Sequence, residues 1–394
     1  MRITDILDQH AVTRPDALAV VDGTTRLSWA ALQLAVDALA HGLIADGLQV
    51  GDRVAVCGHD GVATLVAALA VLRAGGVHAP VDHTLAAPEV AALITALGTP
   101  WRLDVPKGAA IDAPLVLKAT GQARSVDPLG VGASAFLRLS SGTTGAAKGV
   151  LISHASLCER VTAANRGLQL GPDDRVLWLL PMAYHFAVSI LLYLHHGVAI
   201  VFGNALRATG TATIARDNAV TFAYGSPWHI RRLAELPVGH DLPATLTRVV
   251  STTTALDATA AADFRARHGR GVRQGLGIIE VGLPFLSPGE EGERPGDLGA
   301  PLPDYRIELL DEHGDPIDGA GELAITGPGL FDAYLTPWRP RDTVLHRGFF
   351  RTGDRAERTI AGGIRLLGRL KDVINVGGVK VFPLEVESVL DAHP

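Results

Sequence analysis

The sequence predicts an α/β protein with two sheets rich in parallel strands, helices that cover them, and a small β-barrel subdomain. Three observations lead to this prediction. The chain has 394 residues, too many for one simple core. Up to about residue 280, apolar runs of helical and strand spacing alternate, which is typical of parallel sheets with covering helices. From residue 287 onward, Gly, Pro and Asp separate short alternating stretches, which is typical of antiparallel strands.

The alternating part begins with a predicted helix over residues 27–48, whose apolar residues recur at helical spacing. A buried strand over 52–58, a helix over 61–76 and a strand over 77–81 follow it. After residue 150 the alternation resumes with helices over 155–168 and 188–197 and strands over 174–181 and 198–203. Further units of this kind continue to about Glu280.

The later part predicts short strands over 305–311 and 321–327, joined by hairpin-type turns such as "HGDP". We therefore expect one large domain over residues 1–367. Within it, residues 1–286 form the α/β subdomains and residues 287–367 form the β-barrel. Residues 368–394 are expected to hold a hinge and the start of a further, truncated domain.

Charge and hydropathy limit the classes of partner and the compartment that we expect for this protein. A formal net charge of -6 argues against nucleic acid or an anionic membrane as the main partner. The apolar stretch 62–77 is interrupted by Arg73 and is too short to cross a bilayer. The polar N-terminus lacks the apolar region of a signal peptide, and Cys57 and Cys158 lie outside any metal-binding pattern. A cytoplasmic protein without membrane insertion is expected.

The stretch 139–150 reads "LSSGTTGAAKGV" and is suited to holding an anion. Glycines let backbone N–H groups approach phosphate oxygens, hydroxyl groups add donors, and lysine adds charge. A nucleotide P-loop requires G-x-x-x-x-G-K-[ST], and this spacing is absent because Ala147 precedes Lys148 and Gly149 follows it. The loop is therefore predicted to bind phosphate in another way.

This loop resembles the signature of adenylate-forming enzymes, which include acyl- and aryl-CoA ligases, luciferases and the adenylation domains of peptide synthetases. Further stretches resemble motifs of the same family in the same order. They are "RPDALAVVDGTTRLSWAAL", "GLQVGDRVAVCG", "LRAGGVHAPVDHTL", "LPMAYHFAVS", "GLGIIE", "GELAITGPGLFDAYL", "FRTGD" and "GRLKDVINVGGVKVFPLEVE". So many ordered matches make chance negligible.

The resemblance implies binding of ATP and Mg²⁺. It assigns the ATP phosphates to the loop residues Ser140, Ser141, Gly142, Thr143, Thr144, Gly145 and Lys148. It assigns the ribose hydroxyls to Asp354, with Arg369 nearby, and Mg²⁺ to Glu280. It places His185 at the entrance to the carboxylate site and makes Lys371 the hinge residue, so the expected catalytic set is Lys148, Glu280, His185 and Lys371.

The nucleotide pocket departs from the family pattern. Its expected members are Thr252, Thr253, Thr254, Gly275, Leu276, Gly277 and Ile279. Leu276 replaces the aromatic residue that commonly stacks on adenine, and Ile279 replaces a threonine that commonly contacts the α-phosphate. A reshaped adenine pocket with one fewer phosphate donor is expected.

The substrate is predicted to be an aryl or alkyl carboxylic acid. Domains that activate amino acids carry an aspartate where this chain has Ala187, and an unpaired α-ammonium in a closed pocket would be costly. The expected substrate pocket consists of Tyr184, His185, Phe186, Ala187, Tyr224, Gly225, Gly277, Gly282 and Leu283.

The expected reaction is ATP-dependent activation of a small-molecule carboxylic acid to an acyl-adenylate. The acyl group then passes to CoA, to the phosphopantetheine of an acyl carrier protein, or to an amine. The family's C-terminal domain carries a further lysine that this chain lacks. We therefore expect the chain by itself to form the acyl-adenylate much more slowly. Two alternatives stay open: a non-catalytic nucleotide- or acyl-binding homologue, and a relative that activates an acceptor other than a carboxylate.

Overall fold

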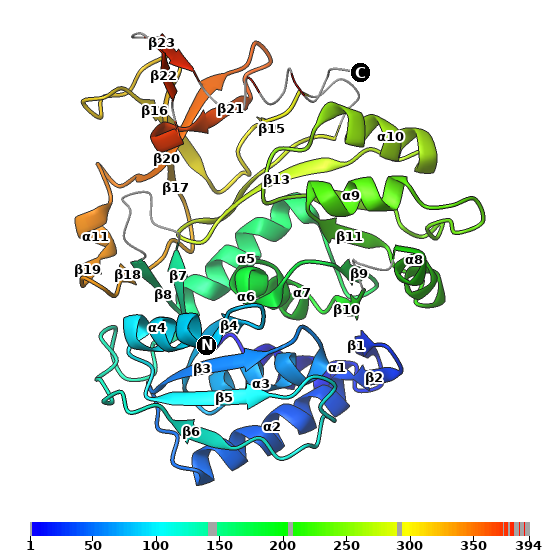
Figure 1. Ribbon diagram of the computed structural model, residues 1–394, viewed down its shortest axis with the longest axis vertical. Helices are drawn as coiled ribbons and strands as arrows, with labels where there is room; N and C mark the ends of the chain where they lie inside the picture. The colour runs from blue at the N-terminus through cyan, green and yellow to red at the C-terminus, as the bar shows by residue number, and fades with distance from the viewer. Residues whose placement is uncertain are drawn as a thin grey trace.

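The computed structural model describes residues 2–140, 148–203, 208–289 and 294–372, and the backbone of two short strands beyond them. Two eight-stranded sheets dominate the fold, and a five-stranded sheet adjoins them (Figure 1). The predicted α/β fold with two large sheets is confirmed.

The first large sheet joins distant parts of the chain. Its strand order is β14 (Gly282–Leu286), β13 (Arg273–Ile278), β12 (Arg248–Ser251), β11 (Phe222–Gly225), β9 (Arg175–Trp178), β10 (Ala199–Phe202), β1 (Leu18–Asp22), β2 (Thr25–Ser28). The six inner strands run parallel, and only the two edge strands are antiparallel. The predicted parallel character is therefore correct here.

The second large sheet is mixed. Its strand order is β19 (Arg339–Pro340), β18 (Ala333–Tyr334), β8 (Lys148–Ser153), β7 (Ser134–Ser140), β4 (Val77–Asp82), β3 (Arg53–Gly58), β5 (Trp101–Val105), β6 (Leu117–Ala119). β7 and β8 form an antiparallel pair that flanks residues 141–147, and Ser140 lies opposite Lys148. β18 extends the sheet on the other side of β8, with Tyr334 opposite Val150.

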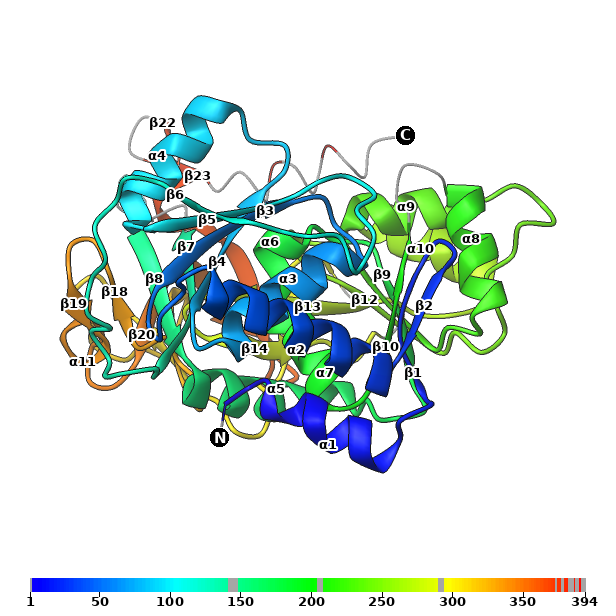
Figure 2. The same cartoon turned by 90° about the horizontal axis from the view of Figure 1, so that it is seen from below.

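Helices lie between the two large sheets and on their outer faces (Figure 2). The inner helices are α2 (Trp29–Ala45), α3 (Val62–Arg73), α5 (His154–Leu168) and α7 (Leu191–His195), with α1 (Asp5–Thr13) beside them. The outer helices are α4 (Ala87–Leu97) on the second sheet and α8 (Ala208–Asp217), α9 (Pro227–Ala234) and α10 (Ala258–His268) on the first.

Local sequence signals set several helix ends. The side chain of Ser28 accepts a hydrogen bond from the N–H of Ala31 at the start of α2, and Ser153 does the same for Ser156 at the start of α5. α3 ends before Gly75, where a φ of 87° suits glycine, as the sequence predicted.

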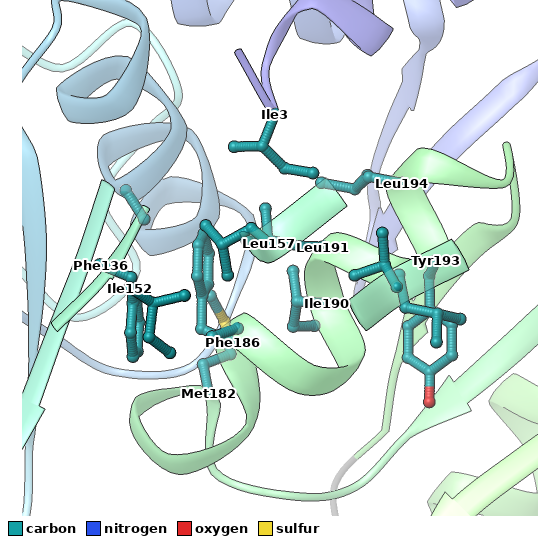
Figure 3. Close-up of a cluster of buried hydrophobic side chains, with 14 of the residues drawn as sticks. Ile3, Phe136, Ile152, Leu157, Met182, Phe186, Ile190, Leu191, Tyr193 and Leu194 are labelled. Atoms are coloured by element: carbon teal, nitrogen blue, oxygen red, sulfur yellow. The ribbon is translucent and has the colours of Figure 1, made fainter. Parts of the chain in front are cut away.

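The main core fills the space between the large sheets. Figure 3 shows its centre, where Phe136, Ile152, Leu157, Met182, Phe186 and Ile190 meet. Short helical turns cross this core: α6 (Met182–His185) leads into a π-helical turn, η1 (Phe186–Ile190), and then α7. This segment also contacts β7, since Arg138 donates a hydrogen bond to the carbonyl of Tyr184.

The third unit is antiparallel, as predicted, but it is an open sheet. Its order is β15 (Asp297–Gly299), β21 (Ile364–Arg369), β20 (Phe350–Arg358), β17 (Gly321–Thr326), β16 (Arg306–Leu310). Among the described residues no pairing joins β15 to β16, so the expected closed barrel is replaced by an open sheet. β15 has only three residues and packs against β13 and β14, which leaves it no free edge to close a barrel.

Three short elements complete the described chain. They are α11 (Arg341–Val344), the turn η2 (Leu370–Asp372), and the hairpin of β22 (Ile374–Val376) and β23 (Val379–Val381). Within the described residues, no helix combines the length and hydropathy that a bilayer crossing needs.

Candidate active site

Two cavities meet where β13 ends beside the third sheet. The outer cavity has a volume of about 340 Å³ and is lined by Thr253, Thr254, Ala255, Gln274, Gly275, Leu276, Gly277, Gly296, Leu298, Asp354, Leu366, Gly368, Arg369 and Asp372. The inner chamber has a volume of about 160 Å³ and is lined by Arg138, Ser140, Lys148, Gly277, Ile278, Ile279, Glu280, Tyr334, Phe350, Thr352, Asp354 and Arg369. Gly277, Asp354 and Arg369 line both cavities, so the two are continuous.

The inner chamber places a lysine, a tyrosine and a glutamate in one row. Lys148 Nζ lies 4.8 Å from the centroid of the Tyr334 ring, within cation–π distance. The Tyr334 hydroxyl donates a hydrogen bond of 3.1 Å to Glu280 Oε1. Burial raises the pKa of Glu280, although this hydrogen bond and the charges of Arg138 and Arg160 oppose the rise. The chamber is therefore lined by three cationic side chains (Arg138, Lys148 and Arg369) and two carboxylates (Glu280 and Asp354).

Asp354 and Arg369 face each other across β20 and β21 at the junction of the two cavities. Their register pairs the two residues, and Arg369 Nε lies 2.7 Å from Asp354 Oδ1. Burial raises the pKa of Asp354, while the charge of Arg369 opposes the rise. One carboxylate oxygen is engaged with arginine in this ion pair, and the side chain still borders both cavities.

The wall of the outer cavity is partly apolar. Leu276 and Gly277, on β13, line it together with Thr253 and Thr254, which follow β12. Thr252 is only 3% exposed, and its hydroxyl donates to the carbonyl of Gly275 at 2.9 Å. Thr252 therefore braces β13 against β12 from behind, while Ile279 borders the inner chamber.

The predicted substrate residues fall into two groups. His185, in α6, lies near the rings of Trp178 and Tyr224, with centroid distances of 6.0 and 6.4 Å. Burial lowers the pKa of His185 to about 3, so its imidazole is neutral at physiological pH. Tyr184 is 47% exposed, and its carbonyl oxygen accepts a 2.5 Å hydrogen bond from Arg138 Nη1.

The second group lies in the core, and of the predicted substrate residues only Gly277 lines either cavity. Phe186 and Ala187 are each 1% exposed, and Phe186 packs near Phe136 in the cluster of Figure 3. Leu283 is 2% exposed and belongs to the same core, and the Cα of Gly282 faces Arg160. Tyr224 is also buried, and the carbonyl of the adjacent Gly225 accepts a hydrogen bond from the Thr252 N–H.

Lys371, the predicted hinge residue, lines neither cavity. Lys371 is exposed in η2, next to Asp372, which lines the outer cavity. Ser141, Gly142, Thr143, Thr144 and Gly145 lie outside the described residues. Ser140 and Lys148, which flank them, both line the inner chamber.

Sequence reasoning missed three residues that shape the inner chamber. Tyr334 lies in the stretch "GELAITGPGLFDAYL", whose resemblance to a family motif assigns no role to this tyrosine. Arg138 interrupts the apolar strand "SAFLRLS", and Arg160 lies on the buried face of α5. A charged residue within an otherwise apolar element is the signal that would have drawn attention to both arginines.

Arg160 holds the turn that carries Glu280. Its Nε and Nη2 donate to the carbonyl of Gly329 at 2.9 and 2.5 Å, and its Nη1 donates to the carbonyl of Ile279 at 2.9 Å. The side chain of Glu159 accepts from the N–H of Gly329 at 3.0 Å. Helix α5 thus fastens two segments: the turn that carries Glu280 and the loop at Gly329 that leads into β18, where Tyr334 lies.

Comparison with known proteins accounts for this arrangement. A family model described as AMP-binding enzyme matches residues 7–335. The chain belongs to the AMP-binding enzyme family. Membership confirms the resemblance to adenylate-forming enzymes that the sequence motifs indicated, and with it the predicted class of ATP-dependent, AMP-forming acid ligases.

Members of this family with curated names cover most of the chain. A feruloyl-CoA synthase from Amycolatopsis sp is 29% identical over 411 residues, which include 98% of this chain and 82% of that protein. A long-chain-fatty-acid–CoA ligase from Thermus thermophilus is 30% identical over 406 residues, or 90% of this chain and 74% of that protein.

A solved structure supports the same conclusion. ATP-bound MatB from Rhodopseudomonas palustris superposes with a TM-score of 0.81 at 26% identity. The match covers 100% of this chain and 84% of that chain.

Proposed function

We propose that the chain activates an aryl or alkyl carboxylic acid with ATP and passes the acyl group to CoA. The observation that carries this proposal is the inner chamber, in which Lys148, Glu280 and Tyr334 lie next to the Asp354–Arg369 pair. The named CoA ligases among the relatives support CoA as the acceptor. ATP and CoA are cytoplasmic metabolites, so we expect the protein to act in the cytoplasm.

In this proposal ATP spans the two cavities. The base lies in the outer cavity against Leu276 and Gly277, and the ribose hydroxyls donate to Asp354. The phosphates lie in the inner chamber with Ser140 and Lys148, and the resemblance assigns them also to Ser141, Gly142, Thr143, Thr144 and Gly145. A volume of about 340 Å³ for the outer cavity is ample for a nucleoside.

Glu280 is the residue that would hold Mg²⁺. Mg²⁺ prefers oxygen ligands and commonly combines one or two carboxylates with substrate phosphates and water, so a single buried carboxylate beside a phosphate chamber fits it. Among the described residues no group of three or more His, Cys, Asp or Glu side chains is arranged to hold a metal. When bound there, Mg²⁺ would neutralise phosphate charge.

The chemistry needs positioning and charge neutralisation more than acid–base groups. An oxygen of the substrate carboxylate attacks the α-phosphorus of ATP, the bond from that phosphorus to the bridging oxygen breaks, and pyrophosphate leaves. Lys148 and the donors around it stabilise the charge that develops on the phosphate oxygens. The thiolate of CoA then attacks the acyl carbonyl, and AMP leaves with the bonding electrons.

Two features support an acid without an α-ammonium group. Ala187 supplies no carboxylate, and the rings of Trp178 and Tyr224 lie near His185, with the cationic Arg138 close enough to act on it. His185, which is neutral at physiological pH, would offer a hydrogen bond without adding charge.

The test is a screen of acids with the full chain, ATP and MgCl₂. Aryl, alkyl and α-amino acids are compared by exchange of labelled pyrophosphate into ATP, and the active acid is then assayed with CoA and with a phosphopantetheinylated carrier protein. We expect exchange with an aryl or alkyl acid, at the reduced rate that the sequence predicts for this chain, and a thioester with CoA. Exchange with none of the acids contradicts the activation step. A thioester with the carrier protein alone contradicts only the choice of acceptor.

A further inference from the structure

Arg138 is a cation at the inner chamber without a fixed counter-ion. It lies on β7, two residues before Ser140, so both side chains project from the same face of the strand. The side chain lines the chamber together with Ser140, Lys148 and Glu280. It is half-buried, and the Tyr184 carbonyl accepts a hydrogen bond from its Nη1.

The guanidinium contacts the ring of Tyr184 as well as its carbonyl, with Cζ 5.5 Å from the ring centroid, and these two contacts leave its charge without a counter-ion. Throughout the described ranges no carboxylate lies within ion-pair distance of Arg138, and its buried Nε has no hydrogen-bond partner there. The charge of Glu280 acts on it only at longer range, and burial lowers the pKa of Arg138. Burying a charged group is costly unless the group is paired, so the cost indicates a partner that is present only part of the time.

The position of Arg138 indicates which partner. Arg138 lies on the side of the chamber that faces Tyr184 and the neighbouring His185, whereas Asp354 and Arg369 border its opening to the outer cavity. Ile279, which also lines the chamber, has an apolar side chain and donates no hydrogen bond from it. An anionic oxygen between the nucleoside end and the His185 end would therefore meet Arg138.

We infer that Arg138 forms an ion pair with an oxygen of the α-phosphate of the bound nucleotide. This inference rests on the proposed function, because it assumes that a nucleotide occupies both cavities. It makes Arg138 a catalytic residue that stabilises charge at the phosphorus under attack. Arginine suits the role because its planar guanidinium can donate to Tyr184 and to a phosphate oxygen at the same time.

The test compares two ligands that differ by one phosphate group. Adenosine and AMP are titrated calorimetrically into the full chain with MgCl₂, for the wild type and for Arg138→Met. We expect the variant to bind AMP about 10- to 100-fold more weakly, the range of a charge-assisted hydrogen bond, with adenosine affinity changed less than about twofold. Arg138→Lys, which keeps the charge, should recover part of the loss.

Arg175→Met is the matched control. Arg175 is also half-buried on a strand and donates from Nη1 to a backbone carbonyl, that of Asn218, at 2.8 Å. It lies outside both cavities, so its variant should keep the wild-type ratio of AMP to adenosine affinity. If Arg138→Met does not fold, Arg138→Gln serves instead, since its amide can still donate to Tyr184.

The outcomes separate this inference from the proposed function. If the Arg138 variants keep the wild-type ratio of AMP to adenosine affinity, the inference is wrong, even when the affinities for both ligands fall together. The proposed function is then unaffected. A wild-type chain that binds neither AMP nor ATP overturns both.

Discussion

At the scale of single residues, Glu280 shows how burial and function oppose each other. Its carboxylate is 8% exposed, burial raises its pKa, and the Tyr334 hydroxyl donates the one side-chain hydrogen bond recorded for it among the described residues. A carboxylate kept in such surroundings gains most when a cation binds beside it. This is the position expected of a magnesium ligand.

Replacing Glu280 by glutamine tests this role. Glu280→Gln keeps the size of the side chain and removes the charge, so we expect the Mg²⁺-dependent part of ATP affinity to fall about tenfold or more. Because the pKa of Glu280 is raised, wild-type Mg²⁺ dependence should weaken as pH falls through that raised value, and the variant should lack this pH dependence. Calorimetric titration with ATP, with and without MgCl₂, measures both effects. Glu308→Gln, on β16, is the control; an equal loss there would argue against a specific role.

At the scale of elements, α5 and the loop before β18 form one unit around Gly329. Gly329 has a φ of 70°, and a Cβ added to it would lie 2.4 Å from the backbone N of Arg160. The backbone of a helix cannot move aside as a flexible side chain can. The loop that leads into β18, the strand of Tyr334, therefore needs glycine at this position.

Gly329→Ala should destabilise the protein by about 3 kcal/mol or more, because backbone strain and a steric clash add. Gly348→Ala is the control, since Gly348 has a φ of 84° but an added Cβ meets nothing within 4 Å. It should cost only the strain, about 1 kcal/mol. Urea denaturation of both variants measures the difference, and equal losses would contradict the contact with α5.

Arg160 should act on stability and on the site together. Arg160→Met leaves the carbonyls of Ile279 and Gly329 without their donors, and we expect a loss of about 3 kcal/mol in the free energy of unfolding. ATP affinity in MgCl₂ should also fall, because the turn that carries Glu280 loses its support. Arg166→Met removes an exposed ion pair of the same helix with Asp304 and should cost less than about 1 kcal/mol. An Arg160 variant as stable as Arg166→Met would refute this role.

At the scale of the whole molecule, buried histidines make the fold sensitive to acid. Burial lowers the pKa of His78 to about 3, and the pKa values of His154, His195 and His229 to about 4. Such groups accept protons more readily in the unfolded chain, where a histidine pKa is near 6.5. The free energy of unfolding is therefore not reduced by these histidines above about pH 6.5, and it falls as the pH drops from there toward their pKa values in the folded protein.

His78 is the clearest case, since it lies against Phe136 and Phe186 in the core between the sheets. Below pH 6.5, His78 should lower the free energy of unfolding by about 1.4 kcal/mol per pH unit, until the pH reaches its pKa in the folded protein. His78→Leu should lower the slope of stability against pH between pH 6.5 and 4.5 by about 1.4 kcal/mol per pH unit, while His154, His195 and His229 keep their share of it. Urea denaturation at several pH values tests the slope, and an unchanged slope would contradict the assignment to His78.

The sequence alone determined the fold class and the family. Apolar periodicity and glycine positions predicted the parallel strands and the end of α3, since both depend on local backbone preferences. The ordered motifs predicted one nucleotide site that includes Ser140, Lys148, Glu280, Asp354 and Arg369. All five residues line one chamber in the structure. The domain bounds 1–367 and 368–394 stay predictions.

The tertiary structure alone decided which side chains reach the cavities. Phe186, Ala187 and Leu283 belong to stretches predicted to bind substrate, yet they face the core, because which face of a short helix or edge strand is buried depends on what packs against it. Tyr334, Arg138 and Arg160 come from three distant segments, and no local pattern links them. They meet because β18 joins the sheet beside β8 and because α5 crosses behind the turn at Glu280, and such long-range pairings follow from packing of the whole chain.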